Sequence, residues 1–310
     1  MTRGLVEKRT RSRDGTSIAY YVLEPASGTD GPVVTWVSAP AMGAPLIAMR
    51  GVYDRLPPHV RVITWDMRGF HGSGPPPERD AYAVERHVED LEAVVAAEGL
   101  NRFVLGGWSM GVPISLEYAA HNPSRIEGML LIAGPFEPDL GLPIPIPGLP
   151  GLVKRLIDRI GDPVGRAVNP FSKRLLGMRG AGHALGVLGL LANEHDSFEA
   201  VLDEFRHIDW ARYFKVIRWL HEHDARPYLT RVSAPSLVVV GDHDRMTPLA
   251  VARRLAGGIA DSELTVVPGG THYMPAEFPD ILANRIARFL DERVARSRSP
   301  QAAHAEEGSR

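Results

Sequence analysis

The stretch Val104-Leu105-Gly106-Gly107-Trp108-Ser109-Met110-Gly111-Val112-Pro113-Ile114 decides the fold of this chain. An apolar strand leads into it and an apolar helix follows, so residues 107–111 read as Gly-x-Ser-x-Gly between a strand and a helix, which is the pattern of a nucleophile elbow. So sharp a turn brings together the residues two positions before and after the serine, and glycine avoids the clash because it has no Cβ. The serine then lies at a helix N-terminus, where free N–H groups and the helix dipole favour negative charge. Five residues alone also fit an ordinary Gly-Ser loop, so the rest of the chain must decide.

The composition bounds the class of protein. The chain has 310 residues, of which 44% are hydrophobic and 23% charged, as in ordinary globular proteins that build a large core. The 35 basic and 37 acidic residues nearly balance, which argues against a nucleic-acid partner held through its phosphates. The sequence contains no cysteine, which excludes disulfides, thiolate metal sites and a cysteine nucleophile.

The N-terminal residues and the apolar runs bear on the cellular compartment of the protein. Residues 1–15 are basic but no apolar stretch follows them, so they do not form a secretory signal. The longest apolar runs, such as residues 185–192, are shorter than the roughly 18 residues that span a bilayer. We therefore expect a cytoplasmic protein with no membrane partner, either a monomer or a homodimer.

Short apolar strands alternate with amphipathic helices along most of the chain. Strands are predicted at 5–13, 16–23, 33–37, 60–65, 103–105, 129–132, 237–240 and 264–267, and helices at 46–56, 83–97, after the elbow, and at 280–290. This alternation predicts an α/β fold with a mostly parallel central sheet flanked by helices. Ligands of such sheets bind beyond the carboxyl ends of the strands, which is where the elbow serine lies.

The alternation breaks at Gly134–Gly151, which holds six prolines and four glycines and cannot continue as a strand or a helix. Helical stripes follow around residues 152–160, 198–205 and 213–220, and no good strand returns before Ser236. We predict a core formed by residues 1–135 and 231–295, a helical cap inserted at 136–230, and a disordered tail at 296–310.

The strand ends after the elbow carry the partners that a serine nucleophile needs. A serine hydroxyl is activated by a base, which in turn needs an orienting acid. In this architecture the chain order is serine, acid, histidine. The strand that ends at Val240 is followed by Asp242 and Asp244, and the next strand is followed by His272. Both aspartates are candidates for the acid on this reasoning.

With these motifs, residues 5–293 resemble the α/β-hydrolase-fold superfamily, in particular its capped serine hydrolases of the esterase and lipase type. The elbow matches the family motif with Ser109 as the nucleophile. Gly241-Asp242-His243-Asp244 resembles the family's acid turn, which implies Asp244 as the triad acid, and Pro268-Gly269-Gly270-Thr271-His272 resembles the loop of the base. Asp66-Met67-Arg68-Gly69 with Gly72-Ser73 is similar to a structural loop of the family. Glu137 and Asp139 occupy another place where related proteins carry the acid.

The oxyanion loop departs from the family pattern. The family usually has His-Gly after the third strand, and Pro40-Ala41 aligns with that pair here. The alignment implies the backbone N–H groups of Met110 and Met42 as the oxyanion donors. A slip of one or two residues would put Pro40, which has no N–H, at the donor position. The implied substrate pocket consists of Trp108, Met42, Phe136 and Tyr273, with core packing as the alternative for Trp108.

The resemblance implies a serine hydrolase that cleaves an apolar carboxylic ester through an acyl-enzyme, with a small-molecule acyl substrate and no cofactor or metal. A lactonase, thioesterase, carbon–carbon bond hydrolase, perhydrolase or acyltransferase would carry the same triad. A ligand-binding receptor without turnover is the alternative from another class. His221-Glu222-His223 could suggest metal ligands, but residues two apart on a helix point away from each other. An exposed face of the cap is the interpretation that the sequence favours there.

Overall fold

The computed structural model describes residues 3–29, 32–78, 81–138, 163–167, 169–170 and 207–295. The helical stripes predicted at 152–160 and 198–205, the acid candidate Asp139 and the tail at 296–310 lie outside the described residues. The boundaries of the cap therefore stay predictions.

A single mixed sheet forms the centre of the described part of the chain. Its strand order is β1-β2-β4-β3-β5-β6-β7-β8, and the pairs β1–β2 and β2–β4 are antiparallel while the others are parallel. The mostly parallel sheet that the alternation predicted is thus present. The strands are β1 Leu5–Arg11, β2 Ser17–Leu23, β3 Val34–Ala39, β4 Val60–Trp65, β5 Phe103–Trp108, β6 Ile126–Ile132, β7 Ser236–Gly241 and β8 Ser262–Val267.

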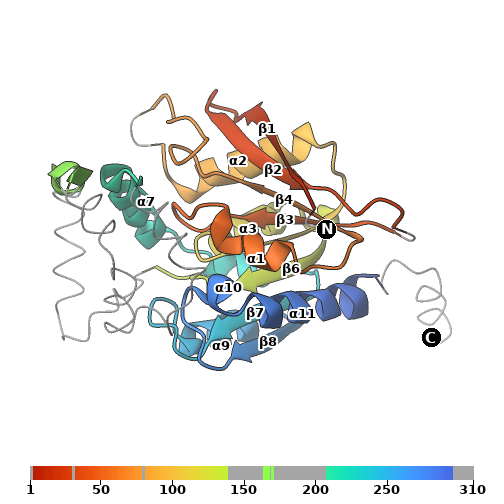
Figure 1. Ribbon diagram of the computed structural model, residues 1–310. Coiled ribbons are helices and arrows are strands. Elements are labelled where there is room, and N and C mark those ends of the chain that lie inside the picture. The colour runs from red at the N-terminus through yellow and green to blue at the C-terminus, as the bar shows by residue number, and fades with distance from the viewer. Residues whose placement is uncertain are drawn as a thin grey trace.

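Helices cover both faces of this sheet (Figure 1). The helices α2 (Val84–Ala97), α3 (Gly111–His121) and α9 (Leu249–Gly258) share one apolar cluster with alternate strand residues. The helices α1 (Ile47–Tyr53), α10 (Met274–Glu277) and α11 (Pro279–Phe289) share the other, followed by a π-helical turn at Leu290–Ala295. None of the helices in the described ranges has the length and apolar character needed to cross a membrane.

Several helical segments belong to the stretch predicted as a cap, among them residues 163–167. The stripe at 213–220 forms α7 (Trp210–Glu222), which begins where the Asp209 carboxylate accepts hydrogen bonds from Ala211 N and Arg212 N. A short helix, α8 (Arg226–Leu229), follows it. The backbone N–H of Ala225 donates to the carbonyl of Phe136 over 2.9 Å, so the predicted beginning and end of the cap lie side by side.

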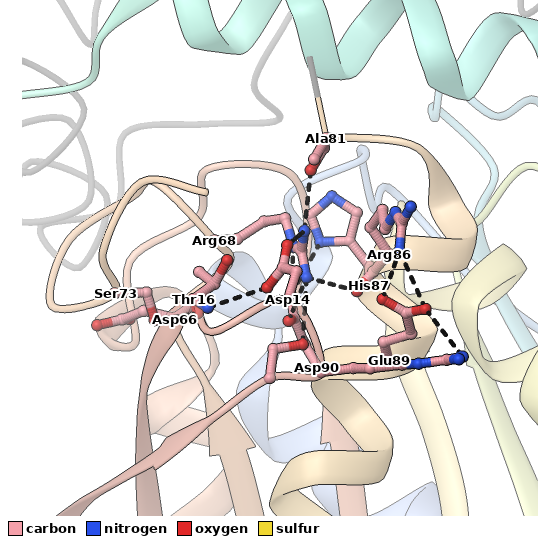
Figure 2. A network of polar contacts seen from close by, with 12 residues as sticks. Asp14, Thr16, Asp66, Arg68, Ser73, Ala81, Arg86, His87, Glu89 and Asp90 are labelled. Carbon is pink, nitrogen blue, oxygen red and sulfur yellow. Dashed lines mark hydrogen bonds and ion pairs between the residues drawn. The ribbon is translucent and has the colours of Figure 1, made fainter. Parts of the chain in front are cut away.

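The Asp66 loop is held by a buried polar network (Figure 2). The Arg68 side chain is fully buried and donates two hydrogen bonds to Asp90, of 2.8 and 2.6 Å, and one of 2.8 Å to Asp14. Ser73 Oγ donates to the backbone carbonyl of Asp66 over 2.6 Å. Bidentate pairing with Asp90 satisfies the buried guanidinium. This arrangement agrees with the structural role expected of the loop.

Candidate active site

The predicted site residues follow three strands that end at the same edge of the sheet. Strand β5 ends at Trp108, directly before Ser109, while β7 and β8 end opposite each other at Gly241 and Val267. The backbone N–H of Ser109 donates over 2.9 Å to the carbonyl of Ile132 at the end of β6, which lies between β5 and β7. The parallel register therefore brings the elbow and the two loops together.

The elbow has the strained geometry that its glycines predict. Ser109 adopts φ = 53°, in the left-handed region that costs a residue other than glycine about 1 kcal/mol or more. A Cβ placed on Gly107 would lie 2.8 Å from the Cα of Gly111 and 2.5 Å from the carbonyl oxygen of Ala39. Neither contact is tolerated by a real side chain. The two glycines therefore allow the sharp turn that raises Ser109 above the sheet.

A continuous hydrogen-bonded chain joins the three polar residues. Ser109 Oγ lies 2.9 Å from His272 Nε2, and His272 Nδ1 lies 3.0 Å from Asp244 Oδ2. A carboxylate accepts and does not donate, so it selects the tautomer with a proton on Nδ1. Nε2 is then free to accept the serine proton. His272 and Asp244 are both buried, whereas Ser109 is half-buried.

The surroundings of the two candidate acids differ. The Asp244 carboxylate accepts hydrogen bonds from Met246 N and Thr247 N, each 2.8 Å, and from Thr247 Oγ1 over 2.7 Å. These three hydrogen bonds hold the carboxylate in place beside the imidazole. Asp242 instead accepts from the backbone N–H of Gly269 over 2.7 Å. The structure thus brings Asp244 to His272 and gives Asp242 a role in holding the base loop.

Two further residues bear on the assignment of the acid. Glu137, an alternative acid, forms an ion pair with Arg254. Thr247, which the sequence analysis did not identify, has its hydroxyl 2.7 Å from Asp244 and 3.4 Å from His272 Nδ1. The sequence feature that indicates Thr247 is its position three residues after Asp244, because an aspartate side chain in a turn often accepts hydrogen bonds from the residues that follow it.

Trp108 occupies a position that differs from its predicted role in the pocket. Its side chain is 2% exposed within the core cluster that α1 and α11 cover, and its indole N–H donates to the backbone carbonyl of His272 over 2.9 Å. A strand places successive side chains on opposite faces, and this parity turns Trp108 into the core. Core packing, the alternative interpretation, therefore describes Trp108 better. Its indole also supports the loop that carries His272.

The oxyanion loop is a tight turn beside the elbow. Ala44 N donates to the carbonyl of Ala41 over 3.1 Å, and Gly43 has φ = 60°. Met42 lies inside this turn and is half-buried. Within the part of the chain that the structure describes, the backbone N–H groups of Met42 and Met110 donate no hydrogen bond. Two unengaged donors are what an oxyanion hole requires, and their assignment to one stays a prediction.

The remaining predicted pocket residues lie around this turn and the base. Phe136 is 4% exposed and belongs to the cluster against which Met42 and Tyr213 pack. Tyr273 is half-buried, with its ring centroid 5.9 Å from that of Trp108. Burial raises the pKa of Tyr273 to about 12, so its hydroxyl stays neutral. Tyr213, from α7, approaches the turn closely, since a Cβ on Gly43 would lie 3.3 Å from its ring.

A cavity of about 400 Å³ opens near the oxyanion loop. Its lining includes Pro45, Leu46, Asp66 and His71, but no member of the hydrogen-bonded chain. It is therefore not assigned as the substrate pocket.

The interpretation of His221 and His223 as an exposed cap face is wrong. His221 is 6% exposed, and the side chain of His223 is 7% exposed at the end of α7. The helix ends between the two residues, because His223 has the extended backbone angles of a C-cap. Helical spacing therefore does not govern where His223 points.

Comparison with known proteins agrees with this fold. Residues 49–279 match the family described as alpha/beta hydrolase fold, which is about three quarters of the chain, so the chain belongs to that family. A Synechocystis protein with the provisional name non-heme chloroperoxidase is 30% identical over 242 residues, covering 74% of this chain and 81% of the relative.

Two further likenesses cover most of the chain. A pimeloyl-[acyl-carrier protein] methyl ester esterase of Pectobacterium atrosepticum is 25% identical over 76% of this chain and 86% of its own. The crystal structure of the enol-lactonase from Burkholderia xenovorans superimposes with a TM-score of 0.69 at 22% identity, covering 92% of this chain and all of that one. These proteins are named for different activities, so the fold alone assigns no substrate.

Proposed function

We propose that the protein is a serine hydrolase that cleaves an apolar carboxylic ester through an acyl-enzyme. The observation that carries this proposal is the chain of contacts of 2.9 and 3.0 Å from Ser109 through His272 to Asp244. A ligand-binding receptor without turnover would have no need to keep a strained serine aligned with a base and a buried acid.

The residues divide the chemistry among them. Ser109 Oγ attacks the ester carbonyl while His272 Nε2 takes its proton, and Asp244 stabilises the imidazolium through Nδ1. The N–H groups of Met42 and Met110 stabilise the oxyanion of the tetrahedral intermediate. His272 then gives the proton to the departing alkoxide, which leaves an acyl group on Ser109. Water deprotonated by His272 attacks that acyl group and releases the acid.

The chemistry of the surroundings favours an apolar acyl or alcohol group. Met42 and Tyr213 pack against the same cluster as Phe136 and Ile208 beside the oxyanion turn. Apolar walls with a few polar groups directed at one atom are typical of small-molecule sites. We expect the substrate to be a small uncharged ester and the protein to act in the cytoplasm.

A chain-length series of p-nitrophenyl esters, from acetate to palmitate, tests the proposal. The wild-type protein is expected to hydrolyse at least one member with saturation kinetics, and Ser109→Ala to lose at least about 10⁴-fold in kcat. Ser73→Ala is the matched control, because Ser73 is a buried serine of the Asp66 loop. A folded wild-type protein that hydrolyses no ester faster than Ser109→Ala would contradict the proposal.

A second candidate, perhydrolysis, is favoured by the relative named as a non-heme chloroperoxidase. Hydrogen peroxide would replace water as the nucleophile that attacks the acyl-enzyme, and a peroxy acid would leave instead of the acid. The same variants distinguish it, with halide oxidation in acetate and hydrogen peroxide as the readout. If Ser109→Ala oxidises halide as fast as the wild type, the triad is not the source of that activity.

A further inference from the structure

A cluster of three ligand-type side chains lies apart from the proposed catalytic residues. Glu85 comes from α2, Glu117 from α3 and His223 from the end of α7, and one ligand atom of each lies within 4.8 Å of the others. His223 Nε2 and Glu117 Oε2 are 3.7 Å apart. The three residues come from separate segments, and His223 belongs to the stretch predicted as the cap.

Two of these side chains are buried and carry a polar atom that makes no hydrogen bond. The side chains of Glu117 and His223 are each 7% exposed, and neither Glu117 Oε2 nor His223 Nε2 makes a hydrogen bond within the described residues. A buried polar atom without a hydrogen-bond partner is unfavourable, and most such atoms in native proteins have one. The two atoms lie 3.7 Å apart, so a single ligand bound between them would satisfy both.

Glu117 is an unexpected residue at its position. The helix α3 is buried along almost its whole length, from Gly111 to Ala119, and Glu117 is its acidic member. Charged side chains are rarely fully buried unless they are paired or bind a metal. A carboxylate oxygen and an imidazole nitrogen are both atom types that bind metal ions.

We propose that Glu85, Glu117 and His223 form a binding site for a divalent transition-metal cation, with Zn²⁺ the best match to their donor atoms. Zinc takes imidazole nitrogen and carboxylate oxygen at about 2.0–2.2 Å, which puts neighbouring tetrahedral ligands about 3.4 Å apart. The pair at 3.7 Å is close to that spacing. Glu85 is exposed and can rotate to complete the set, with water as the fourth ligand.

The site would join the base of the predicted cap to the core. His223 lies two residues before Ala225, whose N–H donates to the carbonyl of Phe136 where the predicted cap begins. Glu117 lies on the helix that follows the elbow. A bound cation would therefore fix α7, which carries Tyr213, relative to α3. Its role would be structural, because none of the three residues belongs to the catalytic set.

Zinc binding to untagged protein, stripped with EDTA, tests the proposal by isothermal titration calorimetry. One Zn²⁺ per chain is expected to bind and to raise the melting temperature, because a ligand of the folded state stabilises it. Glu117→Gln and His223→Gln should each weaken binding by at least about 100-fold, since even partners outside the ligand set matter by 10- to 100-fold. Substitution by Co²⁺ should give visible absorption typical of a low-coordinate site, and Mg²⁺ should not compete.

Matched controls separate this site from casual binding by surface histidines. Glu222→Gln removes an exposed acid beside His223, and His207→Gln removes an exposed histidine before α7, so both should bind as the wild type does. Glu85→Gln changes an exposed residue and should fold even where the buried variants do not, while still losing affinity. If the wild type binds no stoichiometric Zn²⁺, or the site variants bind as well as the controls, the proposal is wrong.

Discussion

The indole N–H of Trp108 donates a hydrogen bond over 2.9 Å to the backbone carbonyl of His272, so the residue before the serine holds the loop of the base. Trp108→Phe keeps a large ring but leaves this buried carbonyl without its donor, which costs about 1–3 kcal/mol. We expect kcat for ester hydrolysis to fall by about tenfold, which corresponds to 1.4 kcal/mol in the barrier. An unchanged kcat in the folded variant would show that the contact does not position the base.

The two aspartates of the acid turn give a matched pair of variants. Asp244→Asn removes the acceptor that fixes the His272 tautomer and is expected to lower kcat by about 10⁴-fold. Asp242→Asn keeps an oxygen for the N–H of Gly269 and should change kcat by less than about tenfold. Steady-state kinetics on one ester measure both. Equal losses in the two variants would contradict the assignment of the acid.

The buried pair of Arg68 and Asp90 is expected to matter for stability. Both side chains are fully buried, so Asp90→Asn leaves the guanidinium short of a countercharge and should lower the free energy of unfolding by about 3 kcal/mol. Glu89→Gln, on the same helix but in a partly exposed pair with Arg86, should cost less than about 1 kcal/mol. Urea unfolding measures the free energy of unfolding of both variants. A similar effect of the two substitutions would refute the argument from burial.

The carboxyl of Glu98 leads to a prediction about how the stability of the protein depends on pH. Burial raises the pKa of its carboxyl, but hydrogen bonds from Tyr20, Lys8 and Arg61 outweigh that effect and hold the pKa below its usual value. The unfolded chain then binds the proton more readily, so the stability that Glu98 contributes is present above its unfolded pKa, about 4.3, and is lost as pH falls through the folded pKa. We would measure the free energy of unfolding of the wild type and of Glu98→Gln from pH 7 downward. The variant should be less stable at pH 7, and the difference in free energy between the two should decrease as the pH falls. A gap that does not depend on pH would contradict this.

Much of the fold and the candidate site could be predicted from local rules. The alternation of strands and helices gave the parallel sheet, and strand ends carried the acid and the base in the order that Ser109 requires. The hydrogen bond of the Trp108 indole could not be predicted from sequence, because its acceptor lies in a loop 164 residues away. His223 was missed for a similar reason: the helix ends one residue before it, and its burial depends on α3. The register of Pro40 to Gly43 rests on a turn that no strand or helix pattern specifies.

Intact mass spectrometry after incubation with a fluorophosphonate tests the central claim most directly, because the probe reacts with an activated serine and not with ordinary hydroxyls. The account predicts one adduct per chain on the wild type, none on Ser109→Ala, and a full adduct on Ser73→Ala. A folded wild-type protein that forms no adduct, or an adduct that persists in Ser109→Ala, would contradict it.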